Sequence, residues 1–251
     1  MTDTYIKIAN IGENKCKQSL CKQFVSGILS GAFLGFGAAC SFKVGSLFPE
    51  RYIGIKRLIT GLFGLPIGLM LIVLCGTQLF TGNTSFYTIS FIEKKIKLLK
   101  SIISLLIIYL GNLTGSLIFA SLIYGSEVLK DNQEVIIIAE KKIETNWGST
   151  FLRGVLCNWF VCLSLWQAVS AKTVTGKAFG IYPTIAGFVV LGLEHSIANM
   201  YIIPQGIILG ANVSALNFIL YNLLPVTLGN ILSGVIFVGI SLSYIHKNND
   251  E

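Results

Sequence analysis

The chain contains uncharged, mostly apolar stretches that are longer than those of ordinary soluble domains. They cover residues 24–42, 58–92, 101–126, 154–171, 178–193 and 196–245. A bilayer core about 30 Å thick is crossed by roughly 20 helical residues, so these windows predict transmembrane helices. Only 12% of the residues are charged, whereas soluble domains carry roughly 25%. The sequence therefore predicts an all-α integral membrane protein and excludes disordered, collagen-like and disulfide-framework classes.

Two windows carry signs of an interruption. The window 58–92 would form one helix about 52 Å long, which is too long for a single crossing. Within it, residues 75–84 change from apolar helix formers to glycine, threonine and asparagine. A similar polar tract at residues 194–199 is followed by Pro204. Because irregular backbone inside a membrane must be buried by protein or line a cavity, we predict six transmembrane helices, with the second and fifth broken.

The charged residues flank the spans and suggest an orientation. We expect one transmembrane domain over residues 1–251, with a cytoplasmic N-terminal segment (about 1–22) and a C-terminal tail (246–251). The lysines and arginines then lie mainly on the cytoplasmic side, as the positive-inside rule requires. This orientation is typical of a multi-pass protein of the plasma membrane with both termini in the cytoplasm. The net charge of +7 is explained by this flanking, so we expect no nucleic-acid partner.

An internal repeat is also visible. Gly111-Asn112-Leu113-Thr114-Gly115 resembles the later stretch Gly229-Asn230-Ile231-Leu232-Ser233-Gly234, and Asn83 and Asn199 are separated by a similar offset. Two units of three spans must run in opposite directions through the membrane. Such 3+3 inverted repeats with paired broken helices place the substrate site at the bilayer midplane. The alternative is that glycine and asparagine merely recur in helix packing.

Glu194 and His195 form the only ionisable pair inside an otherwise apolar segment. Ionisable residues at membrane depth are costly and mark functional sites by default. A histidine can exchange a proton near neutral pH, which predicts a pathway role for His195. The structural alternative is a histidine that fixes the broken helix by a hydrogen bond. Glu194 supports the break by capping exposed amides, pairs with a neighbouring subunit, or contacts substrate directly.

Three further polar residues are candidates for the substrate pathway. Thr81 and Asn199 are expected in the two breaks, where helix N-termini favour a small anion. Lys142 either raises the local anion concentration or extends from the membrane edge into water. No metal-ligand spacing, nucleotide-binding motif or protease motif is present, so we expect no cofactor, no metal and no enzymatic activity.

Four segments resemble the formate/nitrite transporter family, in consistent order over about residues 20–245. They are Gly76-Thr77-Gln78-Leu79-Phe80-Thr81-Gly82-Asn83-Thr84, Cys157-Asn158-Trp159-Phe160-Val161-Cys162-Leu163, Gly192-Leu193-Glu194-His195-Ser196-Ile197-Ala198-Asn199-Met200-Tyr201 and Asn222-Leu223-Leu224-Pro225-Val226-Thr227-Leu228-Gly229-Asn230. The first segment, together with Glu93-Lys94-Lys95, is similar to members from unicellular eukaryotes. The resemblance implies a homopentamer of aquaporin-like protomers with one pore each.

The resemblance also assigns roles to particular residues. It implies that His195 is the central pore histidine, Thr81 the loop threonine and Lys142 the vestibule lysine, with Asn158 and Asn199 near the pore. It places apolar constrictions at Leu65 with Phe188 towards the outside, and at Leu69, Leu79 and Phe80 towards the cytoplasm. Gln78 departs from the acidic residue that many relatives carry, which alters hydrogen bonding at the loop. Leu65 is smaller than the phenylalanine of some relatives, which could admit a larger acid.

These expectations lead to a transporter of small monovalent acids or anions: formate, nitrite, acetate, lactate or hydrosulfide. An unpaired ion in a dry slit is expensive, so we predict proton-linked passage of the neutral acid beside His195. The alternative within the same class is a channel that passes the anion itself. A water or glycerol pore is disfavoured because the breaks lack Asn-Pro-Ala motifs. An intramembrane enzyme is disfavoured because buried titratable groups are few.

Overall fold

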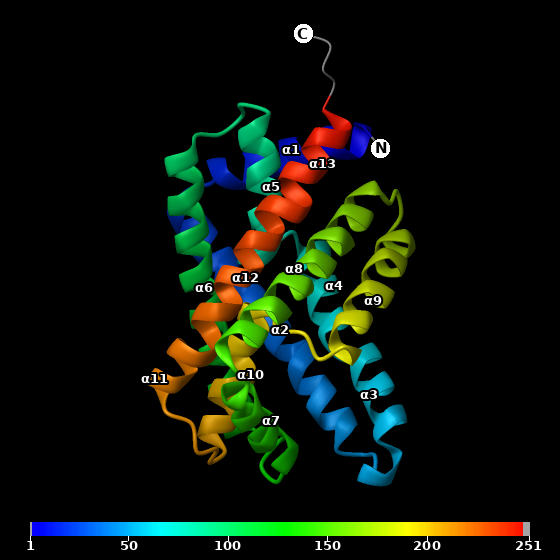
Figure 1. Ribbon diagram of the computed structural model, residues 1–251, viewed down its shortest axis with the longest axis vertical. Helices are drawn as coiled ribbons and strands as arrows, with labels where there is room; N and C mark the ends of the chain where they lie inside the picture. Colours follow the sequence, from blue (N-terminus) through cyan, green and yellow to red (C-terminus); the bar gives the residue numbers. More distant parts are fainter. Residues whose placement is uncertain (1, 248–251) are drawn as a thin grey trace.

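The computed structural model describes residues 2–247, apart from the side chain of Glu50. Every regular element in this part of the chain is a helix, and the helices form one elongated bundle (Figure 1). Five segments within it are long and apolar enough to cross a membrane: Leu20–Gly45, Ile53–Cys75, Leu98–Gly125, Trp147–Ser170 and Ala215–His246. The first, third and fourth are the single helices α2 (Leu20–Gly45), α6 (Leu98–Gly125) and α8 (Trp147–Ser170).

The chain between α2 and α6 is divided into shorter helices. After the 3₁₀ turn η1 (Glu50–Tyr52) come α3 (Ile53–Leu62), α4 (Leu65–Cys75) and α5 (Phe80–Ile92). Residues 76–79 between α4 and α5 are not helical. Gly76 ends α4 with a φ of 68°, in the left-handed region where a side chain is costly. The glycine therefore lets the chain leave α4 abruptly and start α5 four residues later.

A second non-helical segment follows α9 (Val174–Val190). The chain crosses the bundle through residues 191–195 and then enters α10 (Ser196–Ile208), as the yellow segment in Figure 1 shows. Gly192 has the same φ of 68° as Gly76. The placement of Thr81 and Asn199 within irregular backbone is therefore wrong, because each lies in the first turn of a helix. Pro204, expected to follow the interruption, also lies inside α10.

The last apolar stretch alternates α-helical and π-helical turns. Its elements are α11 (Ala215–Asn217), the π segment η2 (Phe218–Leu223), α12 (Leu224–Leu232), the π segment η3 (Ser233–Ile240) and α13 (Ser241–His246). Residues 209–214 connect α10 to α11. Of the predicted tail 246–251, residues 248–251 lie outside the described part. The π segment η2 contains Asn222, which is fully buried. A π turn shifts the register of the side chains along a helix.

Two amphipathic helices cover opposite ends of the bundle: α1 (Thr2–Lys17) and α7 (Gln133–Glu144). Figure 1 shows α1 at the upper end with α13, and α7 at the lower end near α3 and α11. α1 packs on α5, and α7 packs on α10. We call these two ends the α1 face and the α7 face. Residues 1–22 are expected from the sequence only to form a polar segment, so α1 is an addition to that expectation.

Close helix contacts position the polar centre of the bundle. α2 packs along α6, and α8 packs along α12. A Cβ atom added at Gly115 would overlap the carbonyl oxygen of Ile28, and one added at Gly229 would overlap that of Phe151. Only glycine allows these backbones to approach so closely. The two contacts bring Asn112 of α6 and Asn230 of α12 against neighbouring backbones.

Candidate functional site

His195 is the N-cap residue of α10 and lies buried in the middle of the bundle. Its Nδ1 atom accepts a hydrogen bond from the backbone N–H of Ala198 at 3.2 Å. Its Nε2 atom lies 2.9 Å from Oγ1 of Thr81, in the first turn of α5. The side chain thus joins the starts of α5 and α10. The contact at Nδ1 is the helix-fixing hydrogen bond of the structural alternative, whereas the pathway role of His195 stays a prediction.

The hydrogen bond at Nδ1 determines the tautomer of a neutral His195. A backbone N–H can only donate, so Nδ1 must be the unprotonated nitrogen and Nε2 carries the proton. Nε2–H then donates to Oγ1 of Thr81, and the threonine hydroxyl keeps its own proton. The pair can therefore offer a hydroxyl donor to a small oxygen-bearing molecule next to it.

A small apolar cavity of about 10 Å³ adjoins His195. This volume is about that needed for one water molecule. The Phe188 ring centroid lies 6.2 Å from that of His195 in a stacked arrangement. Leucines form half of the wall, which consists of Leu34, Leu65, Leu69, Leu79, Val161, Ile185, Phe188 and His195. Four of the five residues expected at constrictions therefore share one cavity with the histidine.

Phe80, the fifth of these residues, has a different environment. Its ring packs edge-on against Tyr109 of α6, with 4.8 Å between the ring centroids. It lines neither this cavity nor the larger one on the α1 face. The structure therefore gives Phe80 a packing contact at the start of α5.

Asn112 and Asn230 hold the starts of α5 and α10 in the same way. The Oδ1 atom of Asn112 accepts the N–H of Phe80 at 3.0 Å, and its Nδ2 donates to the carbonyl oxygens of Gly27 and Gln78 at 2.8 and 3.1 Å. These contacts explain why α5 starts at Phe80. A distant side chain accepts the N–H of the first helical residue, which the sequence around Phe80 does not reveal.

The contacts of Asn230 match those of Asn112 partner for partner. Its Oδ1 accepts the N–H of Ser196 at 3.0 Å, and its Nδ2 donates to Gly154 and Glu194 carbonyls at 2.7 and 3.2 Å. We call the three contacts of Asn112 the first clamp and the three contacts of Asn230 the second clamp. Asn158 of α8 lies beside the second clamp. Its Nδ2 donates to the carbonyl oxygens of Asn230 at 2.6 Å and Thr81 at 3.3 Å. Asn158 thus connects the second clamp to the threonine.

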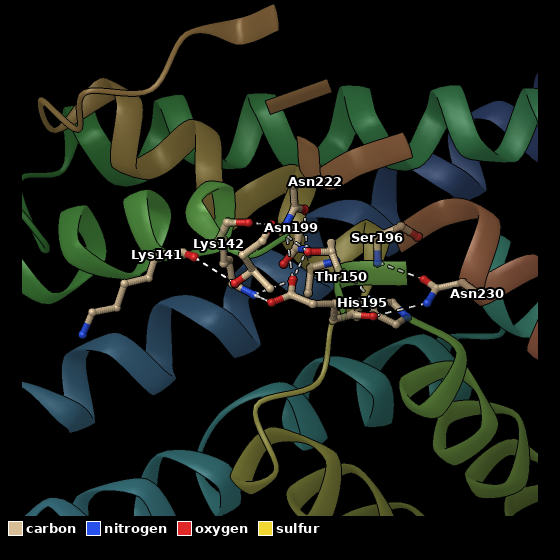
Figure 2. Close-up of polar contacts among 11 residues, drawn as sticks. Lys141, Lys142, Thr150, His195, Ser196, Asn199, Asn222 and Asn230 are labelled. Atoms are coloured by element: carbon tan, nitrogen blue, oxygen red, sulfur yellow. Dashed lines mark hydrogen bonds and ion pairs between the residues drawn. The ribbon is translucent and has the colours of Figure 1, made fainter. Parts of the chain in front are cut away.

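On the α7 face, Lys142 forms an ion pair with Glu194. The Nζ atom lies 2.9 and 2.8 Å from the two carboxylate oxygens, and both side chains are largely buried. Asn199 donates to Glu194 Oε2 at 2.6 Å and to Asn222 Oδ1 at 2.7 Å. Figure 2 shows Lys142, Asn199 and Asn222 converging, whereas Lys141 points away. Glu194 therefore pairs within its own chain, and its charge neutralises that of Lys142.

On the α1 face, the corresponding positions carry no carboxylate. Gln78 lies two residues after Gly76, as Glu194 lies two residues after Gly192. Asn83 donates to Gln78 Oε1 at 2.9 Å, as Asn199 donates to Glu194. Lys15 of α1 donates to the carbonyl oxygen of Thr77 at 3.0 Å and to Oδ1 of Asn83 at 3.5 Å. Gln78 thus supports the first interruption with an uncharged amide.

A cavity of about 480 Å³ opens on the α1 face. Leu79 lines both this cavity and the small one next to His195, so it separates them. Within the described part of the chain, no carboxylate lines the larger cavity, whereas three lysines do: Lys7, Lys15 and Lys177. Burial lowers the pKa of Lys15 to about 8, so at neutral pH it is still mainly an ammonium ion. Lys15 could not be recognised from the sequence, because its partners lie 62 and 68 residues away.

In residues 2–247, no three His, Cys, Asp or Glu side chains come together closely enough to hold a metal ion. The model of the family described as formate/nitrite transporter matches residues 2–244 of this chain. The chain belongs to the formate/nitrite transporter (FNT) family. The resemblance predicted from the four sequence segments is confirmed.

The relatives and solved structures agree with this assignment. A formate-nitrite transporter of Entamoeba histolytica is 33% identical, over 98% of this chain and 70% of the relative. A solved FNT family ion channel is 33% identical, with a TM-score of 0.89 over 98% of this chain and 99% of that one. A second solved structure, a pentameric formate channel with formate bound, is 29% identical, with a TM-score of 0.81 over 92% and 99%. These proteins are transporters or channels rather than enzymes, and this FNT protein is an integral, multi-pass membrane protein.

Proposed function

We propose that this protein carries small monovalent acids across the plasma membrane, with formate, nitrite, acetate, lactate and hydrosulfide as candidate substrates. The observation that carries the proposal is the His195–Thr81 pair, whose histidine lines a small apolar cavity together with Leu79 and Phe188. In this account the anion enters a mouth of the pathway, takes up a proton and crosses beside His195 as a neutral acid. Asn158, Asn199 and the Lys142–Glu194 pair support the pathway walls.

The energetics favour the neutral acid. Moving a carboxylate-sized ion into a dry interior costs of order 20 kcal/mol by the idealised Born estimate, and still several kcal/mol after relaxation. Protonating an acid with a pKa near 4 at pH 7 costs only about 4 kcal/mol. The apolar wall around His195 provides no counter-charge for an anion. Proton uptake before the constriction is therefore the cheaper route.

The matched contacts of Asn112 and Asn230 support the predicted architecture. We infer six membrane spans in a 3+3 inverted repeat, with α3, α4 and α5 as the broken second span and α9 and α10 as the broken fifth. Each half then starts with an amphipathic helix, α1 or α7. The α1 face is the cytoplasmic one in this proposal, which places both termini in the cytoplasm. The pentameric neighbour supports a homopentamer, and we infer one pathway in each protomer.

Uptake of labelled formate, acetate and lactate into proteoliposomes tests the proposed function. At a fixed total concentration, the neutral fraction of each acid rises about tenfold for each unit by which the pH falls. We expect the protein-dependent rate, after subtraction of protein-free liposomes, to rise with this fraction. A rate that follows the anion concentration and ignores pH would favour the alternative, an anion channel. The pentameric neighbour, itself described as a formate channel, is the observation that keeps this alternative in view.

The lysines of the α1-face cavity give a second expectation within this function. Because the pKa of Lys15 is lowered to about 8, the ammonium form is retained at pH 7 and lost as the pH rises through 8. We expect the formate concentration for half-maximal transport from the α1 side to rise severalfold between pH 7 and pH 9. In the Lys15→Met variant this rise should be much smaller. An identical rise in the variant would show that Lys15 is not the group responsible.

A further inference from the structure

The two halves of the chain build the same support around each interruption but differ in its charge. Each interruption starts at a glycine with a φ of 68°, and each is fixed by an asparagine amide from a later helix. Two residues after the glycine, the first half has Gln78 and the second half has Glu194. The chain thus contains its own comparison between a neutral and an acidic residue at equivalent positions.

The acidic residue removes the charge of its lysine. Lys142 contacts both carboxylate oxygens of Glu194, and the amides of Asn199 and Asn222 complete the carboxylate shell. The pair is therefore neutral overall and already satisfied. An anion arriving from the α7 side would have to compete with Glu194 for Lys142.

The neutral residue leaves its lysine charged. Within residues 2–247, Lys15 forms no ion pair and contacts only a carbonyl and an amide oxygen. Gln78 cannot change this, because its Oε1 accepts from Asn83 and Tyr87 and its Nε2 donates to Gln18 and to the carbonyl of Lys15. Lys7 and Lys177 line the same cavity, and the described residues of its wall include no acidic side chain. Among the described residues that line it, the α1-face cavity therefore holds positive charge without a carboxylate, an arrangement that suits a mobile anion.

We propose that Gln78 makes the two mouths of the pathway unequal, so that the α1 face binds a small monovalent anion more tightly than the α7 face. Gln78 determines this affinity because its side chain is uncharged and therefore does not neutralise the ammonium group of Lys15. The proposal rests on the proposed function for the identity of the anion. It predicts that half-maximal transport of formate requires less formate on the α1 side than on the α7 side.

The Gln78→Glu variant tests this proposal in proteoliposomes of determined orientation. A carboxylate at this position would face Lys15 as Glu194 faces Lys142. We expect the half-saturating formate concentration from the α1 side to rise about tenfold and that from the α7 side to change less than twofold. Gln78→Met removes the same amide without adding charge, so it should produce less than a third of the α1-side effect. Equal effects of Glu and Met, or equal half-saturation of both faces in the unaltered protein, would overturn the proposal.

A binding measurement separates this proposal from the proposed function. In detergent, reductive methylation of Lys15 is followed by mass spectrometry at increasing formate concentration. We expect formate to protect Lys15 in the unaltered protein at concentrations at least tenfold lower than in Gln78→Glu. Protection without any uptake of monoacids would sink the transport proposal but keep the anion site. Identical protection in both proteins would remove the role of Gln78, whatever the transport result.

Discussion

Replacing His195 by phenylalanine is expected to abolish pH-dependent formate uptake into proteoliposomes. The substitution removes the Nε2–H group that contacts Thr81 and adds an apolar ring beside Phe188. Among the described residues that line the cavity, His195 is the one with a polar side chain. The neutral acid loses this group in the variant, and uptake should fall by at least about a hundredfold, as for loss of a positioned proton donor. Rates measured at pH 5.5 and pH 7.5 should both approach those of protein-free liposomes.

The control for this experiment has to preserve the helix cap. His195 also accepts the N–H of Ala198, so a loss of uptake in His195→Phe could arise from a frayed α10. Asparagine is a strong N-cap residue, and His195→Asn keeps an acceptor for that N–H while removing Nε2. We expect His195→Asn to fold like the unaltered protein and to lack pH-dependent uptake. Normal uptake by a well-folded His195→Asn would show that the imidazole has only a structural role.

Substituting Asn230 by leucine is expected to have the largest effect on folding. The change leaves the Ser196 N–H and the Glu194 carbonyl oxygen without their side-chain partner, and it removes a second hydrogen bond from the Gly154 carbonyl oxygen inside α8. Each unsatisfied buried group costs about 1–3 kcal/mol, so the free energy of unfolding should fall by at least about 2 kcal/mol. Thermal unfolding in detergent and the yield of monodisperse protein measure this loss. Asn112→Leu should behave in the same way, because its three contacts are equivalent.

A matched control for Asn230 is the exposed Asn212, whose side chain forms no hydrogen bond in the described part of the chain. Asn212→Leu should shift the unfolding temperature by no more than a degree or two. If Asn230→Leu unfolds at the same temperature as Asn212→Leu, the clamp does not hold α10 in place. The inferred correspondence between the two halves would then lose its physical basis.

Local sequence patterns predicted more of the helices than of the contacts between them. The uncharged windows locate the long apolar helices, and the Gly-Thr-Asn tract lies near the point where α4 ends at Cys75. The point where α5 resumes could not be predicted, because Asn112, more than 30 residues away, supplies the acceptor for the N–H of Phe80. For the same reason Thr81 was expected in a loop but lies in a helix.

For the charged residues too, the sequence indicated the residues themselves better than the contacts they form. Glu194 and His195 stand out in the sequence because they interrupt an apolar segment, but the partner of Glu194 could not be inferred. Lys142 is 52 residues away, and Lys15 lies on a helix that was not expected from the sequence. The spacing of the buried Tyr5, Ile8 and Gly12 is that of an amphipathic helix and could have revealed α1. The contact between Lys15 of α1 and Thr77 depends on the tertiary structure alone.

The central claim is that an acid crosses beside His195 as a neutral molecule. It is tested most directly by recording membrane current and internal pH together while a formate gradient is applied across a bilayer that contains the protein. The account predicts acidification of the receiving compartment, one proton for each formate, with no protein-dependent current at any voltage. A current that reverses at the equilibrium potential of formate, without acidification, would contradict it.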